Sequence, residues 1–109
     1  REHIAESVEL FREMGDRVGL ATSTESLAEL AAAEERPELA AQLFGAAEAA
    51  RETLGIPLSP GEETVREQFI TLVRGMIDEV TWSANWAQGG AMSPGQAIEL
   101  GLENAAVPA

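Results

Sequence analysis

Apolar residues recur at helical spacing along almost the whole chain. The first stripe, within residues 2–14, consists of Ile4, Val8, Phe11 and Met14. Gly15 follows it, and glycine readily adopts the left-handed conformation that ends a helix. The pattern therefore predicts a first helix over residues 2–14, and because no start signal precedes Ile4, we expect the chain to be a fragment of a longer protein.

Two further helices are predicted on either side of Arg36-Pro37. Proline disfavours the helical conformation of the residue before it but fits the first turn of a new helix. We therefore expect one helix over residues 18–35 and another over residues 37–54, which Gly55 ends. So short a link makes the two an antiparallel pair.

The second half of the chain repeats one start signal twice, as Ser59-Pro60 and as Ser93-Pro94. Serine is a good N-cap, proline fits the first helical position, and Glu62 or Gln96 can bond back to the cap. These signals predict helices over residues 60–79 and 94–104, with a short helix over 81–88 between them that stops at Gly89-Gly90. The expected buried stripe of the first of these helices is Val65, Phe69, Leu72, Val73, Met76, Ile77 and Val80.

No run of alternating apolar and polar residues is long enough for a strand, so the predicted fold is all-α. In the last helix we expect Ala97, Ile98 and Leu102 to be buried, together with either Leu100 or Gly101.

The charge balance narrows the classes of partner. The 109 residues include 19 acidic and 7 basic ones, for a net charge of −12. A phosphate backbone or an anionic membrane repels such a surface, so we expect no direct nucleic-acid contact and no membrane binding, and favour an apolar or basic protein partner. There is no cysteine and no apolar run of the roughly 18 residues that cross a bilayer. A cytoplasmic location is expected by default.

Residues that could carry chemistry are scarce. His3 is the single histidine, and Glu2 and Glu6 are only its neighbours on an acidic helix. A metal site needs several ligands at controlled spacing, and a nucleophile needs an adjacent base. We therefore expect no catalytic residue, no metal and no cofactor, and the chain is not predicted to be an enzyme.

Small residues in the helix pair carry a resemblance to the tetratricopeptide repeat, over residues 21–54. Leu27-Ala28 resembles the Leu-Gly pair of that repeat, and Ala40 and Phe44 resemble the small residue and the aromatic residue of its second helix. Three positions depart from the pattern: Thr24, Glu35 and Pro57. Small residues at a helix crossing let two backbones approach closely. The residues predicted to pack inside are Leu27, Ala28, Ala31, Ala40, Phe44, Ala47 and the pair Trp82 and Trp86.

The order of the whole chain resembles the C-terminal end of large bacterial ATP-binding transcriptional regulators, of the LuxR type and related signalling ATPases. This resemblance implies a tetratricopeptide-like α-α superhelix with an atypical helical cap. Residues 1–15 would belong to a preceding partial repeat, residues 18–55 would form the helix pair, and residues 60–105 would form the capping helices. It also implies an outward, concave binding face of Thr22, Glu25, Glu29, Ala32 and Ala33.

These patterns favour a protein–protein interaction module that docks on its own ATPase or effector domains or associates with itself, with a dimer expected for the fragment. A purely structural cap is a close relative of this hypothesis. The alternative from another class is a small-ligand sensor that binds a metabolite between helices near Trp82, Trp86 and Met92.

Overall fold

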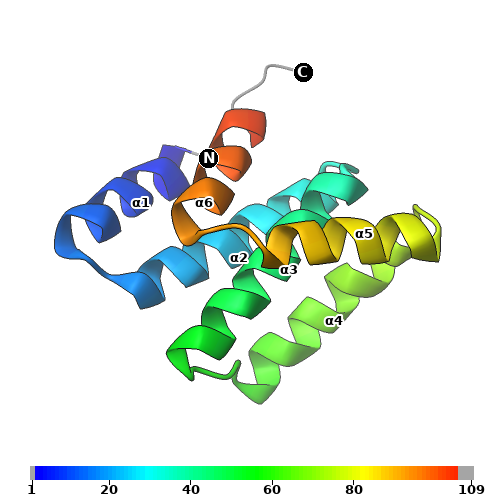
Figure 1. Cartoon of the computed structure of the whole chain (residues 1–109), viewed down its shortest axis with the longest axis horizontal. Coiled ribbons are helices and arrows are strands. Elements are labelled where there is room, and N and C mark those ends of the chain that lie inside the picture. The colour runs from blue at the N-terminus through cyan, green and yellow to red at the C-terminus, as the bar shows by residue number, and fades with distance from the viewer. Residues whose placement is uncertain (1, 106–109) are drawn as a thin grey trace.

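The structure, a computed structural model, describes the backbone of residues 2–105 and the side chains of residues 6–104. This part of the chain contains helices and no strand, so the all-α prediction is confirmed. The helices, shown in Figure 1, are α1 (Glu2–Met14), α2 (Arg17–Ala33), α3 (Pro37–Leu54), α4 (Pro60–Arg74), α5 (Glu79–Gly90) and α6 (Pro94–Ala105). No helix in the described range is long and apolar enough to cross a membrane.

Helices α2 and α3 lie at the centre of the molecule, with α1 on one side and α4 on the opposite side (Figure 1). α3 packs most extensively against α2 and α5, and α6 covers parts of both α2 and α3. α1 packs against α2, and α4 makes smaller contacts with both central helices. Every other helix therefore rests on the central pair.

The helices begin and end where the sequence predicts at the local capping signals Gly15, Gly55, Ser59 and Ser93. Gly15 and Gly55 have φ values of 66° and 68°, in the left-handed region. The Ser59 hydroxyl accepts a hydrogen bond from the Glu62 N–H, and the Glu62 carboxylate accepts one from the Ser59 N–H. Ser93 and Gln96 exchange the same two bonds. The capping boxes expected from the sequence are present.

Other boundaries differ from the prediction. α2 ends at Ala33 rather than at residue 35, because Glu35 takes a left-handed φ of 58° and turns the chain into α3. α4 ends at Arg74 rather than at residue 79. α5 begins at Glu79, since Asp78 caps it by accepting a hydrogen bond from the Thr81 N–H.

The alanines of the central pair are buried as predicted. Ala28, Ala40 and Ala47 have no exposed surface, and Phe44 packs among them with none either. Without long side chains at these positions, α2 and α3 approach closely, and their shared surface forms the centre of the core.

The helix predicted to stop at Gly89-Gly90 does end there, at Gly90, but it includes both glycines. A Cβ atom built on Gly89 would lie 1.8 Å from the Gln42 carbonyl oxygen of α3. One built on Gly45 of α3 would lie 2.2 Å from the Trp86 carbonyl oxygen of α5. The absence of a side chain at Gly45 and Gly89 therefore allows the backbones of α3 and α5 to contact each other directly.

Much of the expected stripe of α4 is not buried. Val73 has no exposed surface, but Val65, Leu72 and Met76 are exposed by 42%, 48% and 36%. Val80, which was expected to end the same stripe, is exposed in α5. The prediction was wrong at these positions because α4 contacts the central pair along one side, through Arg66 and Val73, and nothing in the described structure covers the adjacent side. Met14 of α1, expected on a buried face, is likewise exposed.

The backbone contact of α3 with α5 predicts opposite effects for two glycine substitutions. Gly89→Ala should lower the free energy of unfolding by about 2 kcal/mol, since the overpacking penalty exceeds the gain of about 1 kcal/mol in helix propensity. Gly61→Ala near the start of α4 has no atom within 4 Å of its added Cβ and should be neutral or stabilising. Urea unfolding of both variants measures this difference, and a Gly89→Ala variant as stable as the parent would contradict the close crossing.

Candidate functional site

A group of ionised side chains is buried where α2, α3 and α4 meet. Glu25 of α2 lies between Arg51 of α3 and Arg66 of α4, and all three residues are less than 10% exposed. The Glu25 carboxylate is 3.6 Å from Arg51 Nε and 3.4 Å from Arg66 Nε. Arg66 also forms an ion pair with Glu48 of α3. We call these four residues the ion cluster.

Arg66 connects the ion cluster to α5. Its Nη2 donates a hydrogen bond to the Phe44 carbonyl oxygen at 3.1 Å. Its guanidinium lies over the rings of Phe44 and Trp86, 5.9 Å and 5.5 Å from their centroids. Because a guanidinium can stack on an aromatic face while its edge donates hydrogen bonds, one side chain holds three helices in register.

Burial raises the pKa of the Glu25 carboxyl above its ordinary value of 4.5, because desolvation penalises the charged form. The charges of Arg66 and Arg51 oppose this shift, and the charge of Glu29 adds to it. Neither oxygen of Glu25 has a hydrogen-bond partner. The two long ion pairs therefore compensate only part of the cost of burying this carboxylate.

A polar pocket with a cavity volume of about 540 Å³ adjoins the ion cluster. The end of α3, the connecting segment Gly55–Leu58 and the start of α4 form its walls. Arg51 and Arg66 line it, together with the carboxylates of Glu48, Glu52, Glu63 and Glu67. The pocket thus offers both hydrogen-bond donors and negative charge to a ligand.

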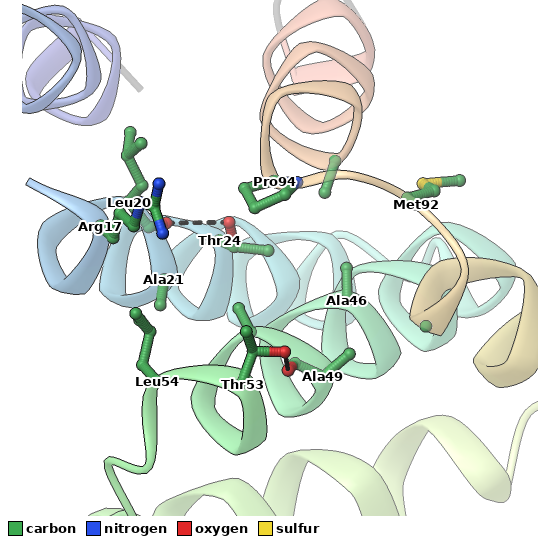
Figure 2. Close-up of a pocket in the computed structure, with 13 residues that line it drawn as sticks. Arg17, Leu20, Ala21, Thr24, Ala46, Ala49, Thr53, Leu54, Met92 and Pro94 are labelled. Atoms are coloured by element: carbon green, nitrogen blue, oxygen red, sulfur yellow. Dashed lines mark hydrogen bonds between the residues drawn. The ribbon is translucent and has the colours of Figure 1, made fainter. Parts of the chain in front are cut away.

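A second, more apolar groove lies between α2, α3 and the start of α6, as Figure 2 shows. Its cavity volume is about 480 Å³. The hydroxyls of Thr24 and Thr53 donate to the carbonyl oxygens of Leu20 and Ala49 in their own helices, so neither is available for chemistry. The groove can accommodate an apolar group, but it brings together no reactive side chains.

The structure exposes some of the residues predicted for a concave binding face and buries the others. Thr22 and Ala33 are exposed and Glu29 is half-buried, so these three meet solvent on one side of α2. The expected exposure of Glu25 and Ala32 was wrong. Ala32 is fully buried in the core, and Glu25 belongs to the ion cluster, where it meets Arg66 of α4. Whether the exposed residues bind a partner stays a prediction.

The residues predicted to pack inside are buried, with Trp86 only partly so. Leu27, Ala28, Ala31, Ala40, Phe44, Ala47 and Trp82 belong to the buried set. The rings of Trp82 and Trp86 lie 5.3 Å apart at an angle of 38°. Arg74 covers Trp82 and Arg66 covers Trp86.

The structure brings together only part of the alternative ligand site near the tryptophans. Met92 faces the groove of Figure 2, whereas neither tryptophan lines that groove or the polar pocket. An arginine side chain of the protein covers each indole ring, Arg74 over Trp82 and Arg66 over Trp86. Neither of the two cavities described above therefore places a ligand against the rings.

Sequence reasoning missed Arg51 and Arg66, although a signal was present. Arg51 follows Ala47 by four residues on the buried face of α3, and Arg66 precedes Val73 by seven on the buried face of α4. A charged residue in register with a buried stripe indicates a buried ion pair, and Glu25 lies three residues before the buried Ala28 on the facing helix.

Groups of three or more residues that could hold a metal ion do not occur among the described side chains. The side chain of His3, the single histidine, lies outside this described set, as does that of Glu2. No family model, no curated protein sequence and no solved structure matches this chain.

The raised pKa of Glu25 predicts a specific pH dependence of stability. Below about pH 4.5 the carboxyl is protonated in both states. As the pH rises through the higher pKa of the folded state, the unfolded chain ionises first, so stability is lost at up to about 1.4 kcal/mol per pH unit.

Glu25→Gln mimics the protonated form and removes this titration. Urea unfolding from pH 4 to pH 7 should therefore show the parent losing stability relative to the Gln variant as the pH rises. The carboxyls of Glu62 and Asp78, whose pKa values are lowered by N–H groups at helix starts, titrate equally in both proteins and cancel. If the free energy of unfolding depends on pH in the same way in the two proteins, the pKa of Glu25 is the same in the folded and the unfolded state.

Proposed function

We propose that this chain is a protein–protein interaction module that docks a partner on the exposed sides of α2 and α4. The observation that carries the proposal is the row of Val65 and Leu72, exposed along one side of α4, with Met76 exposed in the turn that follows the helix. Contiguous apolar side chains on a protein surface are typical of interaction sites.

The exposed residues of α2 extend this row. Thr22, Glu29 and Ala33 lie on one side of α2 at the spacing i, i+7, i+11, and Val65 and Leu72 lie on one side of α4 at the spacing i, i+7. The two helices contact one another. Residues at this spacing share one side of a helix, so two neighbouring helices each present a continuous strip. Such a pair of strips suits an amphipathic helix, which binds through apolar anchors one and two turns apart.

The charges beside the strips favour a basic partner. Burial raises the pKa of Glu29, and the negative charge of Glu62 on α4 raises it further. Two carboxylates that repel each other across α2 and α4 would both gain from a Lys or Arg placed between them. The net charge of −12 opposes docking of a second, identical surface. The occupant we propose is therefore an amphipathic helix with basic residues beside its apolar stripe.

The wider context of the proposal rests on the resemblance described above. A tetratricopeptide-like α-α superhelix, closed by α4, α5 and α6 as a cap, would suit the C-terminal segment of a bacterial transcriptional regulator or signalling ATPase. In that setting the basic helix would belong to the regulator's own ATPase or effector domains. The buried alanines of the α2–α3 pair support the resemblance, because a repeat of this kind needs small residues at that crossing.

Binding of two synthetic helical peptides tests the proposed surface. Both carry the same leucine stripe, flanked by arginines in one and by glutamates in the other. We expect the arginine peptide to bind at least about ten-fold more tightly, since only its charges complement Glu29 and Glu62. Leu72→Glu should weaken this binding by about ten-fold or more, because it places a charge within the apolar row. Fluorescence anisotropy of labelled peptides measures both effects.

Thr71→Glu is the matched control, because it adds the same charge to an exposed position of α4 outside the row. It should leave the affinity within about two-fold of the parent value. Equal affinities for the two peptides, or equal losses from the two variants, would argue against the surface. A dimer in light scattering that Leu72→Glu dissociates would assign the row to self-association instead.

A further inference from the structure

The polar pocket at the junction of α3 and α4 combines features that the interaction surface does not use. One wall is the connecting segment Gly55–Leu58, with the apolar side chains of Ile56, Pro57 and Leu58. Arg51 and Arg66, both members of the ion cluster, also line the pocket. A volume of about 540 Å³ lies within the ordinary range of small-molecule sites.

Arg51 is buried, and one of its N–H donors has no acceptor. It is 8% exposed, and its one ion pair is the 3.6 Å approach of Nε to Glu25. The Arg51 Nε is buried without an acceptor in good hydrogen-bonding geometry. A guanidinium carries five N–H donors, and leaving even one of them unmet in a buried position is costly.

The Nε of Arg66 is likewise buried without an acceptor, but Nη1 and Nη2 of Arg66 both donate hydrogen bonds. Arg66 donates to the Phe44 carbonyl oxygen and pairs with both Glu48 and Glu25. The charge of Arg51 also acts on Glu62, but the Glu62 carboxylate is held by the Ser59 N–H at the start of α4. Arg51 is therefore the donor that a carboxylate entering the pocket would meet.

The rim of the pocket is acidic, in contrast to the arginine side chains that line its interior. Glu52, Glu63 and Glu67 are exposed there, and none of them pairs with a basic side chain within the described range. The arginine charges are already balanced by Glu25 and Glu48. A cationic group at the rim would be stabilised by three uncompensated carboxylates, whereas a phosphate would be repelled by them.

We propose that this pocket binds a basic amino acid. The ligand's carboxylate accepts hydrogen bonds from Arg51, its positively charged groups lie among Glu52, Glu63 and Glu67, and its aliphatic stem packs on the apolar wall of Ile56 to Leu58. A free amino acid and the C-terminal residue of a peptide share this chemistry. Neither a simple anion nor a simple cation satisfies both the buried donor and the acidic rim.

Isothermal titration calorimetry with ligands that each lack one feature tests this assignment. L-arginine should bind saturably. L-argininamide, which lacks the carboxylate, and L-norleucine, which lacks the side-chain cation, should each bind at least about ten-fold more weakly. The peptide Ala-Ala-Arg distinguishes the source of the ligand: tighter binding than L-arginine indicates a peptide C-terminus, and weaker binding indicates the free amino acid.

Two sets of variants locate the site. Glu52→Gln combined with Glu63→Gln removes rim charges from exposed positions and should weaken L-arginine binding about ten-fold without unfolding the protein. Glu38→Gln, an exposed carboxylate at the start of α3, is the matched control and should bind like the parent. Arg51→Gln is made together with Glu25→Gln so that no buried charge is left unpaired, and this double variant should lose the preference for L-arginine over L-argininamide.

The proposal is overturned if L-arginine gives no saturable heat at about 10 mM, a concentration far above that of a specific site of millimolar affinity. Equal binding of L-arginine and L-argininamide would remove the role of Arg51. A rim variant that binds like the parent would place the ligand elsewhere. If the Arg51 double variant fails to fold, the ligand series and the rim variants still decide the question.

Discussion

The structure depends on how closely α3 can approach the helices on its two sides. On the side of α2, Ala28, Ala40 and Ala47 leave no side chain long enough to separate the helices. On the side of α5, Gly45 and Gly89 bring backbone against backbone. Close contact between small residues buries little area per residue. It therefore stabilises the fold only where many such contacts are made along the whole length of a crossing. The chain supplies that length with helices of 17 and 18 residues in α2 and α3.

This closeness explains why the charged residues of the interior are concentrated in one place. Alanine and glycine residues bring α3 close to α2 and α5, whereas α4 lies on the central pair at one edge, where Glu25, Arg51 and Arg66 meet. Arg66 then reaches Phe44 and Trp86 and ties α4 to the crossing of α3 and α5. A buried ion cluster is weak evidence for stability, because desolvation consumes most of the attraction. Its clearer consequence is that α4 has one orientation, which leaves Val65 and Leu72 exposed on its adjacent side.

Two surfaces of different chemistry follow from that orientation. The apolar row of α4, beside the exposed strip of α2, suits another helix. The polar pocket at the junction of α3 and α4 suits a small molecule with both charges. They share the ion cluster as their common support, since Glu25 and Arg66 fix the position of α4 for both. A ligand that engages Arg51 would compete for the same guanidinium that helps to neutralise Glu25, so the two surfaces are energetically connected through one side chain.

The sequence by itself determined the helices that carry local signals. Ser59, Ser93, Pro37 and Gly55 set helix ends through bonds and torsion angles within a few residues, and the small residues of α2 and α3 indicated their close packing. The tertiary structure alone decided which side of α4 is buried, that Gly89 lies inside a helix, and that Glu25 faces two arginines. Periodicity identifies an apolar side but not the neighbour that covers it, and the cost of burying a charge depends on partners far away in the chain. The candidate sites therefore emerged from packing, whereas most of the helices were predictable from the order of residues.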